Sequence, residues 1–139
     1  MDVNKGFHKS YEKDQVTANN FIAALLCGNN TGPCVAPNDS LAPNSTLFLF
    51  WAGHGGNGML FLPDMQAHSA LYADELVSAL RAARARGFAR VLMYVEACDS
   101  GSMFEGLLGP ADEGIFAVTA AAKSENSYPT YCCDYFRWV

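Results

Sequence analysis

Two segments of the chain carry side chains that together could transfer an acyl group. Cys98 follows an apolar run that ends in Glu96, and His54 lies within a glycine-rich run at 53–58. A histidine beside a cysteine lowers the pKa of the thiol or removes its proton, and the thiolate then attacks a carbonyl carbon. Taken alone, each residue has a structural alternative, a small core cysteine and a histidine in a turn. Taken together, they predict that Cys98 is a nucleophile and His54 its general acid/base.

Residues around this pair supply other groups that acyl transfer needs. The backbone N–H groups of Gly55 and Cys98 are candidates for an oxyanion hole, since glycine allows close approach of the backbone. Glu96 precedes Cys98 by two positions on a strand, so both side chains point to the same face. Glu96 there either accepts hydrogen bonds from a substrate or is a buried acid paired with an arginine or backbone amides. No second Cys or His lies at zinc-ligand spacing, so no metal site is expected.

Two apolar strands, at 46–52 and 90–96, are expected to position these groups. Each is a near-continuous apolar run, which is typical of a parallel strand covered on both faces. His54 and Cys98 follow the carboxyl ends of these strands, where open α/β sheets place their ligand crevice. If the two strands are neighbours, both side chains emerge at the same edge of the sheet.

The rest of the chain continues an α/β pattern. We predict two helices and two further strands, at 18–27, 73–86, 59–62 and 115–120. Thr17 is the expected N-cap of the first helix and Gly28 its C′ residue. Arg81, Arg84 and Arg86 near the end of the second helix suit its dipole and are expected to form a solvated face. Strand, helix and strand at this spacing imply a parallel sheet with right-handed connections.

Residues 28–45 are expected to form a surface loop, because Gly, Pro, Asn and Ser dominate them. The loop holds three N-glycosylation acceptor patterns, at Asn29, Asn38 and Asn44. Three acceptors in one exposed loop favour a protein of the secretory pathway. Cys27 and Cys34 flank a turn at the start of this loop, where they could form a disulfide.

Length and composition limit the remaining possibilities. The 139 residues suit a single domain, and half of them are hydrophobic. A formal charge of -5 without a Lys/Arg cluster argues against a nucleic-acid partner. No apolar run approaches the roughly 20 residues that span a bilayer, so no membrane segment is expected. The N-terminus lacks the apolar core of a signal peptide, which fits either a cytosolic protein or a chain whose true start lies upstream. Nothing in the sequence indicates an oligomeric state.

Two motifs resemble the catalytic signatures of the legumain family (peptidase family C13), the asparaginyl endopeptidases among the caspase-like cysteine peptidases. They are Gly-His-Gly-Gly-Asn-Gly at 53–58 and Glu-Ala-Cys-Asp-Ser-Gly-Ser at 96–102. The likeness continues, in order, at 16–21, 103–106 and 119–128. It implies a caspase-like three-layer α/β/α fold with a mainly parallel sheet, peptide or protein substrates, no cofactor, and a vacuolar, lysosomal or secretory location.

The resemblance also implies a mechanism. Cys98 would be the nucleophile and His54 the general acid/base, with the amides of Gly55 and Cys98 holding the oxyanion. Glu96 would line the S1 pocket that binds the Asn carboxamide, and Ser127 would lie on the pocket wall. The reaction would be hydrolysis after Asn, less readily after Asp, through a thioester acyl-enzyme.

The chain departs from the family pattern at two positions near this site. Gly53 stands where legumains usually have Asp, and Asn126, a candidate substrate-binding residue, stands where they tend to have Ser. The form with Gly53 also resembles the catalytic subunit of GPI transamidase. The alternative functions are therefore a GPI-transamidase-like acyltransferase and an inactive, truncated relative.

The resemblance further implies a partial peptidase domain over 1–139, incomplete at both ends. Legumains begin with strands and helices that carry a catalytic Asn and an Arg-His pair, and nothing before residue 17 matches them. The missing strands would pair beside the strand at 46–52. An apolar strand edge left open in this way favours aggregation.

Overall fold

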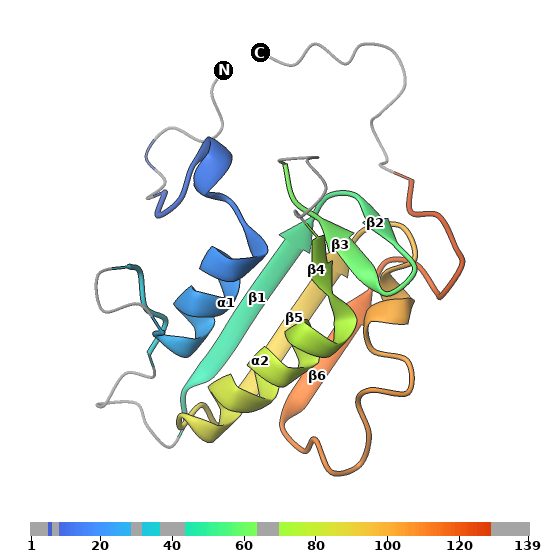
Figure 1. Cartoon of the computed structure of the whole chain (residues 1–139). Coiled ribbons are helices and arrows are strands. Elements are labelled where there is room, and N and C mark those ends of the chain that lie inside the picture. The colour runs from blue at the N-terminus through green and yellow to red at the C-terminus, as the bar shows by residue number, and fades with distance from the viewer. Residues whose placement is uncertain (1–5, 7–8, 29–31, 37–43, 64–69, 129–139) are drawn as a thin grey trace.

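The computed structural model describes residues 6, 9–28, 32–36, 44–63 and 70–128. A parallel three-stranded sheet forms its centre, in the order β1 (Thr46–Ala52), β5 (Arg90–Glu96) and β6 (Ile115–Thr119) (Figure 1). The two predicted strands are thus neighbours, with Thr46 opposite Arg90 and Ala52 opposite Glu96. Because these strands are parallel and in register, their carboxyl ends place the segments that follow them at one edge. The predicted α/β class with a mainly parallel sheet is confirmed.

Two α-helices, α1 (Ala18–Leu26) and α2 (Ala73–Ala85), accompany the sheet, and a short 3-10 helix, η1 (Lys13–Gln15), precedes α1. The expected N-cap is present, since Thr17 Oγ1 accepts a hydrogen bond of 3.1 Å from the Asn20 amide. The prediction that Gly28 is the C′ residue of this helix was wrong. Cys27, not Gly28, adopts the left-handed conformation, with φ of 52°, and a disulfide joins it to Cys34. This bond confirms the proposed pairing.

A small antiparallel sheet lies beyond the carboxyl ends of β1 and β5 (Figure 1). It contains β2 (Gly55–Gly56), β3 (Met59–Phe61) and β4 (Ala70–Tyr72), in that order. The strand at β3 was predicted, whereas β2 and β4 were missed, since β2 has only two residues and β4 runs directly into α2. The 3-10 helix η2 (Ser100–Met103) follows β5 and packs against both β3 and α2. The strand–turn–strand unit after β1 therefore lies beside the turn after β5.

The hydrophobic core fills one face of the parallel sheet. There, alternate residues such as Leu47, Val91 and Met93 are buried. The helix α2 runs across this face in front of β5 (Figure 1), and it contacts both β5 and α1. Large apolar side chains on the opposite face are exposed in the described part of the chain: Phe48, Phe50, Tyr94, Phe116 and Val118. The expectation that both faces of these strands are covered was therefore wrong for the described residues. An uninterrupted apolar run indicates that both faces of a strand are apolar. It does not indicate that other elements cover both faces.

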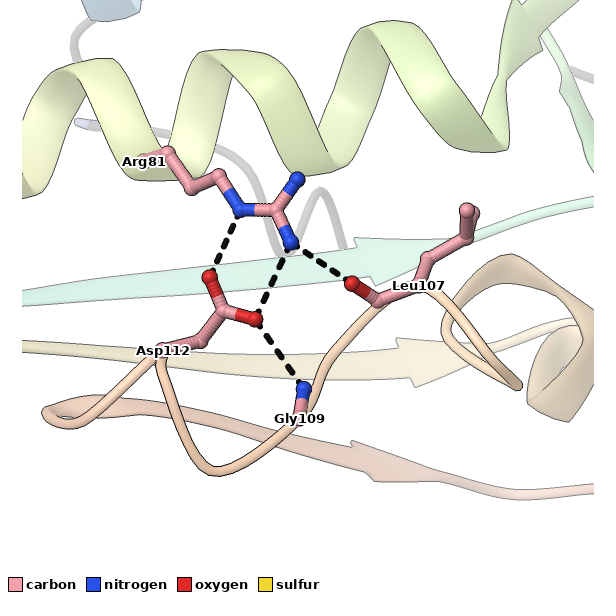
Figure 2. Close-up of polar contacts among 4 residues, drawn as sticks. All are labelled: Arg81, Leu107, Gly109 and Asp112. Atoms are coloured by element: carbon pink, nitrogen blue, oxygen red, sulfur yellow. Dashed lines mark hydrogen bonds and ion pairs between the residues drawn. The ribbon is translucent and has the colours of Figure 1, made fainter.

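The expectation that the three arginines near the end of α2 form a solvated face was wrong, because each of them bonds to a neighbouring segment. Arg81 makes a two-pronged ion pair with Asp112, at 2.6 and 3.0 Å, and also donates to the Leu107 carbonyl (Figure 2). Arg84 donates to the Phe88 carbonyl. Arg86 donates to the carbonyls of Leu25 and Val35 and to Cys27 Sγ. These cations fasten α2 to three neighbouring segments.

The ion pair of Arg81 holds the loop before β6 against α2 (Figure 2). Asp112 also accepts a hydrogen bond of 3.0 Å from the Gly109 amide. Its carboxylate therefore both closes the turn at 109–112 and contacts α2 through Arg81. The hydrogen bonds from Arg81, and then that from Gly109, lower the pKa of Asp112 to about 2. The carboxylate consequently stays ionised in mildly acidic solution.

Candidate active site

β5 delivers Cys98 to the carboxyl edge of the parallel sheet. The strand ends at Glu96, and the chain then turns through Asp99, whose φ of 54° lies in the left-handed region that Asp tolerates better than most residues. Cys98 is a free, partly buried cysteine. Its Sγ lies 3.7 Å from the carbonyl oxygen of Ser127, to which the thiol donates. The thiol thus faces the segment that follows β6.

Glu96 and Ser127 contact each other beside this thiol. Ser127 Oγ donates a hydrogen bond of 2.5 Å to Glu96 Oε1, and both residues are partly buried. The structure therefore gathers three of the predicted site residues, Glu96, Cys98 and Ser127. The alternative for Glu96 was a buried acid paired with an arginine. Among the ion pairs of the described residues, none involves Glu96, and its hydrogen-bond partner is the neutral hydroxyl of Ser127.

Gly55 packs directly against the backbone of Cys98. A Cβ built on Gly55 would lie 2.3 Å from the Cys98 carbonyl oxygen and 3.0 Å from Ala97 Cβ, so a larger residue cannot fit without a shift of backbone. Gly55 pairs with Leu60 in the small sheet, and the neighbouring residue His54 accepts a ladder bond from the Phe61 amide. Bonded and non-bonded pairs alternate in antiparallel ladders. The Gly55 amide therefore belongs to a non-bonded pair and is not needed by the ladder.

His54 stands between two contacts that join its loop to β5. The Gly53 amide donates a hydrogen bond of 3.0 Å to the Glu96 carbonyl on one side, and Gly55 packs against Cys98 on the other. The backbone of His54 is thereby held beside residues 96–98. No hydrogen bond joins the imidazole to the Cys98 thiol among the bonds of the described residues, and the His54 side chain is exposed. Catalytic hydrogen bonds are often long or misaligned in an enzyme without its substrate.

A cavity of about 530 Å³ borders His54 on the side of β1. Its walls are mainly apolar and include Phe21, Trp51 and Phe61. The rings of Phe21 and Trp51 meet edge to face, with centroids 5.7 Å apart, so α1 and β1 together form this wall. Because the His54 side chain is exposed and borders this cavity, its imidazole is open to solvent on this side.

Asn126 is not drawn into the group of Glu96, Cys98 and Ser127. It is exposed, and its side-chain amide donates a hydrogen bond of 3.3 Å to the hydroxyl of Tyr128. The neighbouring Ser127 points the other way, toward Glu96. Of the two candidate pocket residues on this segment, Ser127 contacts the site and Asn126 does not.

Two serines that sequence reasoning gave no role lie in the turn after Cys98. Ser100 is fully buried and exchanges hydrogen bonds with the backbone of Ala121, and the nearly buried Ser102 bonds to Gly58 and Asp99. The available signal was the Ser-Gly-Ser order itself, because small polar residues beside a reactive group often bond to backbone. That signal cannot name the partners.

Comparison with known proteins identifies relatives over nearly all of the chain. The model of the Peptidase C13 family matches residues 1–137. A vacuolar-processing enzyme of Citrus sinensis is 42% identical over 137 residues, and the beta-isozyme of Arabidopsis thaliana is 38% identical over 137 residues. A vacuolar-processing enzyme of Ricinus communis is 39% identical over 134 residues. Each alignment covers 94% of this chain and 26% of the relative.

The chain thus spans about a quarter of the length of the curated relatives it matches. In the described residues, no helix has the length and apolar character needed to cross a membrane. The family match extends over both the His54 and the Cys98 segments and over the sheet that positions them. The chain belongs to the peptidase C13 family, the legumain family.

Proposed function

We propose that this chain forms the catalytic core of a cysteine endopeptidase that cleaves after Asn and, less readily, after Asp. The observation that carries the proposal is the group around the thiol: Glu96, Cys98 and Ser127 in contact, with Gly55 packed on the Cys98 carbonyl. The group lies at the carboxyl edge of a parallel sheet, where α/β folds bind ligands.

In the first half of the reaction, His54 takes the proton of Cys98, and Sγ attacks the carbonyl carbon of the scissile bond. The oxyanion that forms accepts hydrogen bonds from the Gly55 and Cys98 amides. His54 then returns the proton to the nitrogen of the leaving amine, and the C–N bond breaks. The product is a thioester between Cys98 and the new carboxyl end of the peptide.

In the second half, His54 removes a proton from water, and the hydroxide oxygen attacks the thioester carbon. The C–S bond breaks, and Cys98 is regenerated with a proton from His54. The second half therefore uses the same imidazole and the same oxyanion donors as the first.

Preference for Asn follows from the chemistry of Glu96 and Ser127. Glu96 Oε1 already accepts from Ser127, and its second oxygen, which has no partner among the described residues, would accept from the NH₂ of an Asn carboxamide. The Ser127 oxygen offers a further lone pair to the same group. An ionised Asp has no hydrogen to donate and is repelled by Glu96, so Asp would bind only when protonated. Cleavage after Asp should therefore require lower pH than cleavage after Asn.

The test uses three fluorogenic peptides that differ only in Asn, Asp or Gln before the scissile bond. We expect cleavage in the order Asn, Asp, Gln, an Asp rate that rises as pH falls, and no cleavage by the Cys98→Ala variant. Equal cleavage of all three peptides, or activity that survives Cys98→Ala, would overturn the proposal.

We also infer a vacuolar location through the secretory pathway, because the relatives are named vacuolar-processing enzymes and Asn44 is an exposed glycosylation acceptor. Expression in plant cells, followed by fractionation and endoglycosidase treatment, tests this. We expect the protein in the vacuolar fraction with a mobility shift after treatment. Recovery in the cytosol without a shift would contradict the inference.

A further inference from the structure

The loop that carries His54 lies along the turn that carries Cys98 and touches it at three points. The Gly53 amide bonds to the Glu96 carbonyl, and Gly55 packs on the Cys98 carbonyl. At the third point the Gly58 amide, at the tip of the β2–β3 hairpin, donates a hydrogen bond of 2.7 Å to Ser102 Oγ. Contacts at the start, middle and tip therefore fix the hairpin on the segment 96–102.

Of these three contacts, only the one with Ser102 is made by a side chain. It is 8% exposed, and its hydroxyl donates a hydrogen bond of 2.6 Å to the Asp99 carbonyl while it accepts from Gly58. Asp99 directly follows Cys98. A single oxygen of Ser102, a residue 44 positions beyond Gly58 in the sequence, thus joins the tip of the His54 hairpin to the residue after the thiol.

The hydrogen bond between Gly58 and Ser102 is not needed to hold the turn at 99–102 together. The Asp99 carbonyl also accepts a hydrogen bond of 2.8 Å from the Ser102 backbone amide. Removal of the hydroxyl therefore leaves the turn with its own backbone bond. The group that loses its partner is the Gly58 amide, on the side of the hairpin.

The tip of the hairpin is held from outside on both sides of Gly58, whose carbonyl accepts a hydrogen bond of 3.0 Å from the Ala73 amide and whose amide donates to Ser102. Glycine occupies four of the six positions from 53 to 58, and Gly58 adopts φ of +73°. Glycine loses the most conformational freedom on ordering, so a glycine-rich loop depends on outside contacts for a fixed position.

We propose that Ser102 is a positioning residue that holds the His54 loop at working distance from the Cys98 thiol. This inference rests on the proposed Cys98–His54 mechanism. Ser102 touches neither substrate nor reacting atoms and acts through Gly58 and the hairpin. Its loss would let the imidazole drift and would weaken its effect on the thiol, without removal of either catalytic group.

Ser100 provides a matched comparison, because it is a buried serine two positions away in the same turn. Its hydroxyl donates to the Ala121 carbonyl at 3.2 Å and accepts from the Ala121 amide at 3.1 Å. It therefore joins the turn to the segment that leads to Ser127, on the side of the pocket and not of the hairpin. Ser100→Ala should disturb folding at least as much as Ser102→Ala, because Ser100 is 0% exposed.

The experiment measures the alkylation rate of Cys98 by iodoacetamide between pH 4 and 9 on the full 139-residue chain. Mass spectrometry quantifies the Cys98 peptide separately from the peptide with Cys132 and Cys133. A histidine that acts on the thiol extends its reactivity to pH well below the ordinary pKa of about 8.5. We expect Ser102→Ala to lose about tenfold in rate at pH 6 and to approach the profile of His54→Ala. Ser102→Thr, which keeps a hydroxyl, should restore the profile, and Ser100→Ala should retain it.

A wild-type profile in Ser102→Ala, when His54→Ala differs from wild type, would overturn the positioning role alone. A wild-type profile identical to that of His54→Ala would refute the Cys98–His54 pair and the positioning role with it. If Ser102→Ala fails to give a folded chain by circular dichroism, Ser102→Val replaces it. That variant has nearly the volume of Ser102→Thr but no hydroxyl to accept from the Gly58 amide, and the same shift is expected.

Discussion

Ser127 Oγ donates a hydrogen bond to Glu96 Oε1, which joins the last residue of β5 to a segment 31 positions further along the chain. The same segment places the Ser127 carbonyl 3.7 Å from Cys98 Sγ. A carboxylate, a hydroxyl and a thiol from two distant segments therefore meet beyond the end of one strand. In the proposed mechanism, this arrangement places the residues that select the substrate beside the thiol that reacts with it.

Glu96→Gln should weaken cleavage after Asn and reduce the preference for Asn over Asp. The substitution keeps the shape but removes the charge that strengthens hydrogen bonds to the substrate amide and repels ionised Asp. A lost charged hydrogen bond of about 1.5–3 kcal/mol corresponds to about a 10- to 150-fold loss in kcat/KM for Asn peptides. Glu105→Gln is the control, because Glu105 is exposed and pairs with Lys123 at the surface. Equal losses in both variants would argue against a role of Glu96 in selectivity.

Gly55→Ala should reduce kcat/KM by about 100-fold, because its methyl group displaces the hairpin from Cys98 by part of an ångström or more. The built Cβ lies 2.3 Å from a backbone oxygen, which cannot move as a side chain can. Gly56→Ala is a matched control in the same strand, since its Cβ would meet only side-chain atoms of Phe61 and Met59 at 3.5–3.6 Å. Peptide hydrolysis measures the effect, and similar activities for the two variants would contradict the close packing of Gly55 on Cys98.

The ion pair between Arg81 and Asp112 should lend the chain stability that is lost in strong acid. The pKa of Asp112 is lowered to about 2 by the folded structure, whereas an unfolded chain has a value near 3.8. A depressed carboxyl pKa contributes stability above the unfolded value and loses it as pH falls from about 4 to about 2. Thermal melting of wild type and Asp112→Asn between pH 2 and 5 should show a Tm difference that shrinks over this interval.

The control for this pH dependence is Glu113→Gln, because Glu113 is the adjacent, exposed acid. It should leave the Tm of the chain nearly unchanged across the same interval. A Tm difference between wild type and Asp112→Asn that stays constant from pH 5 to pH 2 would show that the ion pair does not act in this way.

Arg86→Met should lower the free energy of unfolding by about 1–2 kcal/mol, since it removes charged hydrogen bonds but keeps most of the apolar stem. Arg86 bonds to the Leu25 and Val35 carbonyls and to Cys27 Sγ, so it connects the end of α2 to the end of α1 and the disulfide loop. Urea denaturation measures the change. Arg90→Met, at an exposed residue that begins β5, should change stability much less, and a reversed order would contradict the fastening role.

Much of the fold follows from local sequence signals. The apolar runs of β1 and β5 and the periodicity of α1 and α2 predicted these elements within one or two residues. The spacing between the two strands predicted a parallel sheet, and the structure shows that β1 and β5 are neighbours in it. Because Cys98 and the His54 loop come directly after these strands, their common location at one sheet edge was predicted on the condition that the strands are neighbours.

The contacts that complete the site were not predictable, because their partners are distant in sequence. Ser102 meets a glycine 44 positions away, and Arg86 meets Cys27 59 positions away. Such pairs depend on how helices and turns pack, and the residue types alone do not select one partner among many. The covered face of the sheet was ambiguous for the same reason, since apolar residues such as Phe48 and Leu47 occupy both faces of β1.

In the proposed mechanism, Cys98 acts as a nucleophile that His54 activates and that Glu96 directs toward Asn. The most direct measurement exposes the chain to short peptides that end in an electrophilic ketone after Asn, Asp or Gln and locates the adduct by mass spectrometry. We predict that the Asn probe labels Cys98 at least about tenfold faster than the Gln probe, which is the discrimination expected from one poorly matched side chain, and that His54→Ala slows this labelling. Equal labelling by all three probes, or labelling of the other cysteines in preference to Cys98, would contradict the claim.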